Sequence, residues 1–305
     1  MTMKKLGLLF TRISVGSMSA AVLALLPLPA HAAWTLNMTP GISEISRKVY
    51  SLHMLMYWWC VAIAVVVFGW MIYSIVRFRK SQGAVPDTKL VHSTKAEIIW
   101  TVLPVLILIG MAVPATRTLI DTDDATGTEL TIRVTGYQWK WGYQYVGSGV
   151  TLFSTLDRDS NAARQLGSGI DPNSVPNYLL NVDNPLVVPA GTKVRLLLTA
   201  QDVIHSWWVP ALAIKKDAIP GFLNEAWFKI DTDKTGLYRG QCAELCGRDH
   251  GFMPIVIDVR SKADFADWLR TQRALQQPAA PAVPAAPAAA TAPTAQVTTS
   301  TPVAG

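Results

Sequence analysis

Two cysteines, two histidines and a methionine lie at spacings that could bind a metal ion. His205 lies in the segment DVIHSWW, and the others follow as Cys-x3-Cys-x3-His-x2-Met at Cys242, Cys246, His250 and Met253. Thiolate, imidazole and thioether groups are soft ligands, which favour copper over harder divalent ions. Zinc is satisfied by four nitrogen, oxygen or thiolate ligands and has no use for a thioether, so Met253 favours copper further.

The second cysteine bears on how many metal ions the site would hold. A mononuclear blue-copper site uses one cysteine, two histidines and a weak axial methionine. Two thiolates that each bridge two coppers would let the metals share one unpaired electron, with His205 and His250 as terminal ligands. Such a rigid site suits fast electron transfer and leaves no open position for a substrate. The alternative is a disulfide between Cys242 and Cys246, which an oxidising compartment would favour.

A β framework is expected to position these ligands. After Arg117 the chain consists of short alternating segments bounded by Gly, Pro, Asn and Asp, a pattern typical of an all-β sandwich or barrel. The metal-binding loop would join the last two strands, and His205 would come from the end of an earlier strand. The predicted strands cover residues 129–145, 178–182, 193–200, 226–230, 236–240 and 252–260.

Two segments after Arg117 do not follow the strand pattern. Residues 147–177 are polar and Gly-rich without a clear period, so we expect an excursion on the surface. Residues 261–275 begin with Ser261 and Asp264 in capping-box spacing. They also place three apolar side chains on one helical face, which predicts a short helix packed on the β domain: Phe265, Trp268 and Leu269.

Two apolar runs are long enough to cross a bilayer, whose hydrocarbon core needs about 20 helical residues. Residues 55–76 carry no charge, and residues 98–116 contain two prolines, which membrane helices tolerate. The loop between them holds five basic residues and two acids, Asp87 and, directly before the second run, Glu97. By the positive-inside rule this loop is cytoplasmic, so both ends of the mature chain lie outside.

The two ends of the chain predict processing and disorder. Residues 1–32 resemble a secretory signal peptide, because basic residues precede a short apolar run and small residues follow it. The alternative, an uncleaved membrane anchor, is less favoured because Pro27 and Pro29 interrupt the run. Residues 274–305, rich in Ala and Pro, are expected to form a disordered tail. The predicted domains are therefore a hairpin of two transmembrane helices over 33–117 and a β domain over 118–273.

The charge distribution also separates the membrane part from the β domain. The whole chain has a formal net charge of +6, whereas residues 118–273 contain 16 basic and 18 acidic side chains. The positive surplus therefore reflects membrane topology and argues against nucleic-acid binding. A slightly acidic exported domain would suit a basic protein partner.

Three segments resemble the motifs of the cytochrome c oxidase subunit II family: DVIHSWWVP, DAIPGF and GQCAELCGRDHGFMP. The resemblance covers nearly the whole mature chain. It implies a bacterial oxidase of the aa3 type, in which a cupredoxin-like Greek-key barrel holds a dinuclear copper A centre. This centre would take electrons from cytochrome c and pass them to haem in subunit I, the partner that reduces oxygen to water and translocates protons. It also implies an inner-membrane location, with the copper domain and both mature termini in the periplasm.

The resemblance implies roles for single residues. Glu244 would bind copper through its backbone carbonyl, and its side chain would reach a magnesium or manganese ion shared with subunit I. The remaining copper ligands would be side chains: His205, Cys242, Cys246, His250 and Met253.

Other implied roles lie outside the ligand set. Trp139, in GYQWKWGYQY, resembles the tryptophan that faces cytochrome c and accepts the electron, although aromatic residues on a strand are more often packing residues. Glu97 matches the glutamate at the entrance of a proton pathway in subunit I. From the residues alone, Glu97 would complement the dipole of its helix. Asp183 and Asp202 would be acids near the docking face.

Two further functions stay open at this point. A membrane-tethered copper carrier or assembly factor would bind the metal without conducting electrons. A quinol oxidase subunit would share the fold but lack the copper ligands, which this chain retains. The chain does not contain the multi-helix, histidine-bearing core that haem would need, so we expect no oxygen reduction by this chain alone.

Overall fold

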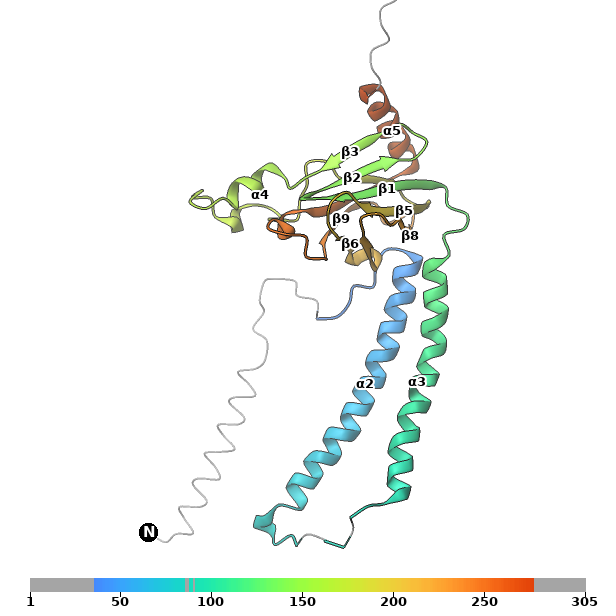
Figure 1. Ribbon diagram of the computed structural model, residues 1–305, viewed down its shortest axis with the longest axis vertical. Helices are drawn as coiled ribbons and strands as arrows, with labels where there is room; N and C mark the ends of the chain where they lie inside the picture. Colours follow the sequence, from blue (N-terminus) through green and yellow to red (C-terminus); the bar gives the residue numbers. More distant parts are fainter. Residues whose placement is uncertain (1–35, 86–87, 90, 277–305) are drawn as a thin grey trace, which may run out of the picture.

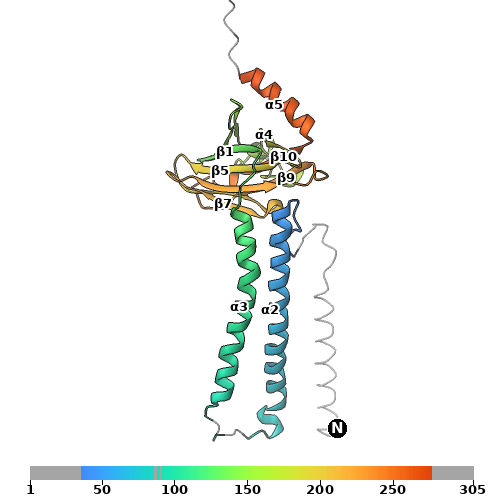
Figure 2. The ribbon, with the colours of Figure 1, turned by 90° about the vertical axis from the view of Figure 1, so that its right-hand side faces the viewer.

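The computed structural model describes residues 36–85, 88–89 and 91–276, and in it two long helices carry a β domain at one end (Figures 1 and 2). The predicted signal peptide and most of the predicted tail lie outside the described residues. Helix α2 covers Glu44–Arg77, and α3 covers Thr94–Asp123. Both are long and apolar enough to cross a membrane.

The helices extend beyond the predicted spans 55–76 and 98–116, mainly toward the β domain. Helix α2 begins at a capping box, in which the side chain of Ser43 accepts from the backbone of Ser46 and Ser46 reaches back to Ser43. A short 3-10 turn, η1 (Lys80–Gln82), lies between the two helices.

The β domain consists of two five-stranded sheets with orders β3-β2-β1-β5-β8 and β4-β10-β9-β6-β7. The pairs β1/β5 and β4/β10 are parallel, and the others are antiparallel. Both sheets contribute to one core, which includes the fully buried Trp141, Tyr143 and Trp207. The strands are β1 (Leu130–Tyr137), β2 (Lys140–Tyr145), β3 (Thr151–Ser154), β4 (Leu186–Pro189), β5 (Lys193–Ala200), β6 (His205–Val209), β7 (Ile214–Ala218), β8 (Asn224–Lys229), β9 (Gly236–Cys242) and β10 (Pro254–Arg260).

The all-β prediction is confirmed, with differences in single strands. The segment 193–200 matches β5, whereas 129–145 is split into the hairpin of β1 and β2. The predicted strand 178–182 is wrong, because these residues mainly form a turn. Asn177 and Leu179 have φ angles of 52° and 62°, which bend the chain where an extended strand would be needed.

The segment 147–177 is more ordered than its composition predicts. It contains β3, the helix α4 (Arg158–Ala163) and the 3-10 turn η2 (Pro172–Ser174), and two residues of α4 are buried. The predicted terminal helix is confirmed as α5 (Lys262–Gln276), which extends into the first residues of the predicted tail. The backbone N–H of Asp264 donates to Ser261 Oγ at its start, and Trp268 packs 5.2 Å from Tyr145 between ring centroids.

The entrance to α2 is attached directly to the β domain. The N–H of Ile42 donates to the carbonyl of Ala211 at 3.1 Å, and the N–H of Asp231 donates to the carbonyl of Ile42 at 3.1 Å. Arg47, one turn into α2, forms an ion pair with Asp231. These contacts fix the position of the β domain at this end of the helix.

Candidate metal centre

Three neighbouring strands bring the predicted ligands together. Cys242 is the last residue of β9, and Met253 directly precedes β10. The loop between these strands carries Cys246 and a 3-10 turn, η4 (His250–Phe252). Strand β6 pairs with β9 in a register that places Trp207 opposite Cys242, so His205 at the start of β6 reaches the same cluster.

The two thiols are separate, and each lies beside its own histidine. Their Sγ atoms are 3.9 Å apart, far more than the bond length of about 2.05 Å in a disulfide. Cys242 Sγ lies 4.0 Å from Nδ1 of His205, and Cys246 Sγ lies 3.5 Å from Nδ1 of His250. Met253 adds its Sδ atom 3.5 Å from Cys246 Sγ. The donor atoms therefore form one buried, sulfur-rich cluster.

Glu244 presents its two oxygen-bearing groups differently. Its backbone carbonyl accepts from Cys242 Sγ at 3.4 Å, so this oxygen borders the cluster. The residue as a whole is exposed on the loop between the cysteines. The carbonyl is thus placed to join the ligands while the carboxylate is free to contact another molecule.

The cluster has unusual acid–base properties in the metal-free chain. Burial and the neighbouring Cys242 raise the pKa of the Cys246 thiol to about 12. Burial also opposes ionisation of Cys242, but His205 and the backbone of Ser206 and Glu244 outweigh it and lower that thiol's pKa. Burial would lower the pKa of His205, yet Cys242 and Asp202 raise it overall. Since metal ligands must be deprotonated, binding would release protons and weaken as the pH falls.

Asp202 orients one of the predicted ligands. Its Oδ1 lies 2.9 Å from Nε2 of His205, and its Oδ2 accepts from the backbone N–H of Gln138 at 2.7 Å. A proton held on Nε2 leaves Nδ1 free to face the cysteines. The family resemblance implies only a docking role for Asp202. Its position three residues before His205 is the feature of the sequence that indicates a contact with this histidine.

We expect Asp202→Ala to weaken metal binding by about 10- to 100-fold, as is usual when the partner of a ligating histidine is removed. Without the carboxylate, the His205 ring loses its fixed orientation. Affinity can be measured by competition with a chelator of known affinity. Asp233→Ala, which removes an exposed acid after β8, is the control. Equal affinities in both variants would contradict this role for Asp202.

Trp139 contacts the metal-binding loop directly. It lies at the turn between β1 and β2, where its Nε1–H donates to the carbonyl of Cys246 at 3.2 Å. Gln138 Nε2 donates to the same carbonyl at 2.9 Å. Gly247 permits this approach, since its φ is +116° and a Cβ atom there would lie 3.2 Å from the Trp139 ring. The half-buried indole therefore connects the molecular surface to the backbone of a predicted ligand.

Arg164 is a contact of the loop that sequence reasoning missed. It follows α4, and its Nε donates to Asn161 Oδ1 at 2.8 Å. Its guanidinium lies 3.6 Å from Asp249 and 4.2 Å from the ring centroid of Phe252, residues on either side of His250. The segment 147–177 thus supports the loop. No motif in that segment signals the contact.

Glu97 is not brought near the cluster. It lies in the first turn of α3, at the end of the helix away from the β domain (Figure 1). Its Oε1 accepts from the backbone N–H of Ser93 at 3.2 Å and lies 3.8 Å from Nδ1 of His92. The position suits an acid that complements the positive end of a helix dipole.

The chain thus combines a hairpin of two membrane helices with a cupredoxin-like β domain, which carries a His/Cys cluster that could hold a metal ion. Residues 130–260 match the family "Cytochrome C oxidase subunit II, periplasmic domain", and residues 31–118 match "Cytochrome C oxidase subunit II, transmembrane domain". The chain therefore belongs to the cytochrome c oxidase subunit II family, as its motifs predict.

Two relatives agree with this assignment. A protein of Rickettsia prowazekii (strain Madrid E), named probable cytochrome c oxidase subunit 2, is 42% identical over 238 residues, which cover 78% of this chain and 72% of the relative. Cytochrome c oxidase subunit 2 of Triticum aestivum is 34% identical over 261 residues, covering 85% of this chain and 98% of the relative. The crystal structure of the periplasmic domain of subunit II (CoxB) of Bradyrhizobium japonicum shares 41% identity, with a TM-score of 0.43 over 50% of this chain and 98% of that one.

Proposed function

We propose that this chain accepts electrons from a cytochrome c at a dinuclear copper A centre and passes them to haem in subunit I. The observation that carries the proposal is the pair of buried, unbonded thiols 3.9 Å apart, each beside its own histidine. One copper would need only one of these thiolates, whereas two bridging thiolates with two terminal imidazoles fit two coppers.

The chain would hold the centre with groups already placed around the cluster. The residues that would hold it are Cys242, Cys246, His205, His250, Met253 and, through its carbonyl, Glu244. Bound copper would supply one-electron transfer. Both cysteines, His205 and Met253 are buried, so the fold excludes water from these donors. Asp202 contacts His205, and Arg164 contacts the residues on either side of His250. These contacts support a rigid site whose ligands would move little during electron transfer.

The surroundings of the cluster support a direction for electron flow. Trp139 links the surface to Cys246 through one hydrogen bond, so it is the proposed acceptor facing cytochrome c. The exposed carboxylate of Glu244 would bind a magnesium or manganese ion shared with subunit I. Glu97, at the opposite end of the hairpin, would collect protons for a pathway in that partner.

The proposed location rests on the basic loop between the two helices and on the predicted signal peptide. The chain would lie in a bacterial inner membrane, with the loop between α2 and α3 in the cytoplasm and the β domain in the periplasm. Oxygen reduction, proton translocation and haem binding would belong to partner subunits. The expected partners are therefore subunit I, other oxidase subunits, cytochrome c and the lipid bilayer.

Copper analysis of the purified full-length chain tests the proposal. We expect two copper ions per chain and an EPR signal whose hyperfine splitting arises from two equivalent copper nuclei. The reconstituted chain should accept an electron from reduced cytochrome c and show no oxygen uptake alone. A single copper with one-nucleus hyperfine splitting would instead indicate a copper carrier and contradict the proposal.

A further inference from the structure

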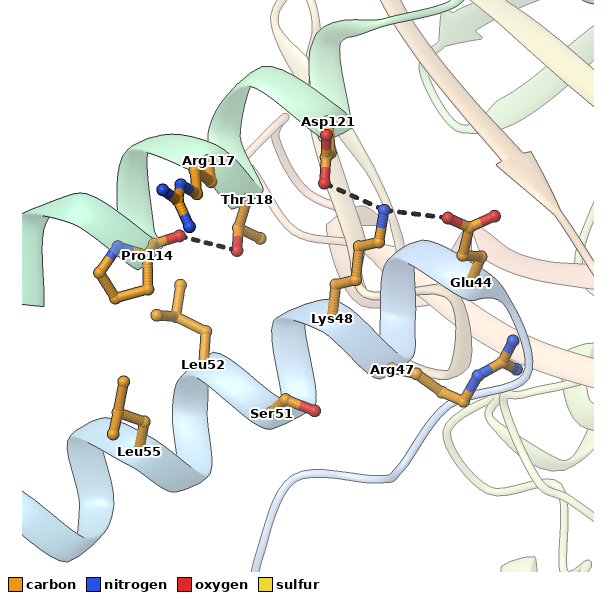
Figure 3. Close-up of a pocket in the computed structure, with 10 residues that line it drawn as sticks. All are labelled: Glu44, Arg47, Lys48, Ser51, Leu52, Leu55, Pro114, Arg117, Thr118 and Asp121. Atoms are coloured by element: carbon orange, nitrogen blue, oxygen red, sulfur yellow. Dashed lines mark hydrogen bonds and ion pairs between the residues drawn. The ribbon is translucent and has the colours of Figure 1, made fainter.

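A cavity of about 500 Å³ lies between the ends of α2 and α3 that face the β domain (Figure 3). Its part nearest the β domain is charged, and the part farther down the helices is apolar, with Leu52, Leu55 and Pro114 among its lining residues. The change from charged to apolar lining occurs near residue 55 in α2, where its apolar run begins, and near residue 116 in α3, where its apolar run ends. The cavity therefore lies at the expected boundary between water and hydrocarbon.

Most of the charged groups around the cavity are already paired. Arg47 pairs with Asp231 outside it. Lys48 Nζ lies between Glu44 Oε1 at 2.9 Å and Asp121 Oδ2 at 3.0 Å (Figure 3). Two carboxylates thus share one ammonium, which leaves one net negative charge in this trio.

Arg117 carries the complementary charge. Its guanidinium enters the same cavity from α3, and within the part of the chain that the structure describes it makes no hydrogen bond or ion pair (Figure 3). The hydroxyl of Ser51, which also lines the cavity, likewise makes no hydrogen bond among the described residues. The cavity therefore offers a five-donor cation and a hydroxyl beside a net anionic trio.

The apolar part continues along the two helices toward the middle of the hairpin. A second cavity of about 580 Å³ lies between them and is lined only by apolar side chains, among them Ile63, Val66, Leu103 and Leu108. The helices therefore leave an open apolar groove between them below the charged cavity.

We propose that this groove binds one phospholipid whose headgroup carries a phosphate and a primary ammonium. The phosphate binds the guanidinium of Arg117, which matches phosphate oxygens with paired N–H donors. The ammonium binds the carboxylates of Glu44 and Asp121, and one acyl chain follows the apolar groove. The negative charge of the headgroup balances Arg117, and its positive charge balances the net negative charge of Glu44, Lys48 and Asp121. A quaternary ammonium could not donate hydrogen bonds to the carboxylates, and an anionic headgroup without an ammonium would be repelled by them.

Native mass spectrometry of the full-length chain released from nanodiscs tests this site. The probes are discs of phosphatidylethanolamine, phosphatidylcholine or phosphatidylglycerol. We expect one retained phosphatidylethanolamine and weaker retention of the other two lipids. Arg117→Gln should lower its affinity by about tenfold, because a charge-assisted hydrogen bond is lost. Asp121→Asn should reduce the preference for phosphatidylethanolamine over phosphatidylcholine.

The control is Arg77→Gln, which removes a basic residue at the opposite end of α2. It should leave lipid retention unchanged, and circular dichroism should show that all variants keep the fold. Equal retention of the three lipids, or equal losses in Arg117→Gln and Arg77→Gln, would overturn the proposal. A structure of the assembled oxidase with a helix of another subunit filling the groove would also overturn it.

Discussion

Cys246→Ser is expected to reduce the copper content of the purified chain from two ions to at most one. Serine is a hard ligand with a high pKa, so it cannot replace a bridging thiolate. Cys246 also contacts both His250 and Met253, and its loss removes the atom around which these two donors gather. Copper analysis and the EPR hyperfine pattern measure the effect, and the signal should lose its two-nucleus splitting.

Cys60→Ser is the matched control, since Cys60 is an exposed thiol within α2. This variant should keep both copper ions and the original EPR signal. Thermal unfolding of the metal-free proteins separates a lost ligand from a lost fold. A folded Cys246→Ser protein that still shows two equivalent copper nuclei would contradict the bridging role.

Trp139→Leu is expected to slow electron acceptance from reduced cytochrome c by at least about tenfold, equivalent to about 1.4 kcal/mol in the barrier. The indole and the amide of Gln138 both donate to the carbonyl of Cys246, but only the indole has a π system, and leucine offers neither the π system nor the N–H. Docking involves many other residues, so the Kd for cytochrome c should change much less. Stopped-flow reduction gives the rate, and salt-matched binding measurements give the Kd.

Trp268→Leu provides the comparison for loss of a tryptophan elsewhere. Trp268 packs on Tyr145 from α5 and has no contact with the metal-binding loop among its ring contacts. Its replacement should leave the reduction rate unchanged. Both variants must retain the copper spectrum for the rates to be compared. A normal rate in copper-loaded Trp139→Leu would show that electrons reach the centre by another route.

The proximity of the predicted side-chain ligands could be foreseen because chemistry and spacing agree over a short distance. Four of its residues lie between Cys242 and Met253, and only His205 had to be brought from elsewhere. The supporting contacts depend on tertiary structure. Asp202 binds the backbone of Gln138, 64 residues away, and Arg164 reaches the loop from a segment of unremarkable composition. A residue pattern carries no information about such pairs.

The alternation of polar and apolar residues was enough to predict a β domain, but it did not predict where the turns lie. Residues 129–145 read as one strand because Gln138 and Trp139 alternate like the strand that follows them. The alternation nevertheless changes phase at Gly136 and Tyr137, next to the turn. Conversely, residues 178–182 have the composition of a strand, but the positive φ angle of Leu179 prevents an extended conformation. This turn is held by a contact distant in sequence, because the N–H of Leu179 donates to Ser160 Oγ of α4 at 3.1 Å.

The junction between α2 and the β domain has a consequence for biogenesis. Arg47 is synthesised early, yet its ion-pair partner Asp231 follows 184 residues later. Ile42 likewise waits for Ala211 and Asp231. The end of α2 next to the β domain therefore cannot make these contacts until strands β1 to β8 and Asp231 have been translated. Formation of the two helices and docking of the β domain are thus separate events, and the second can follow only after residues 211–231 have been synthesised. In the proposed periplasmic location, docking would also have to wait until the β domain has crossed the membrane.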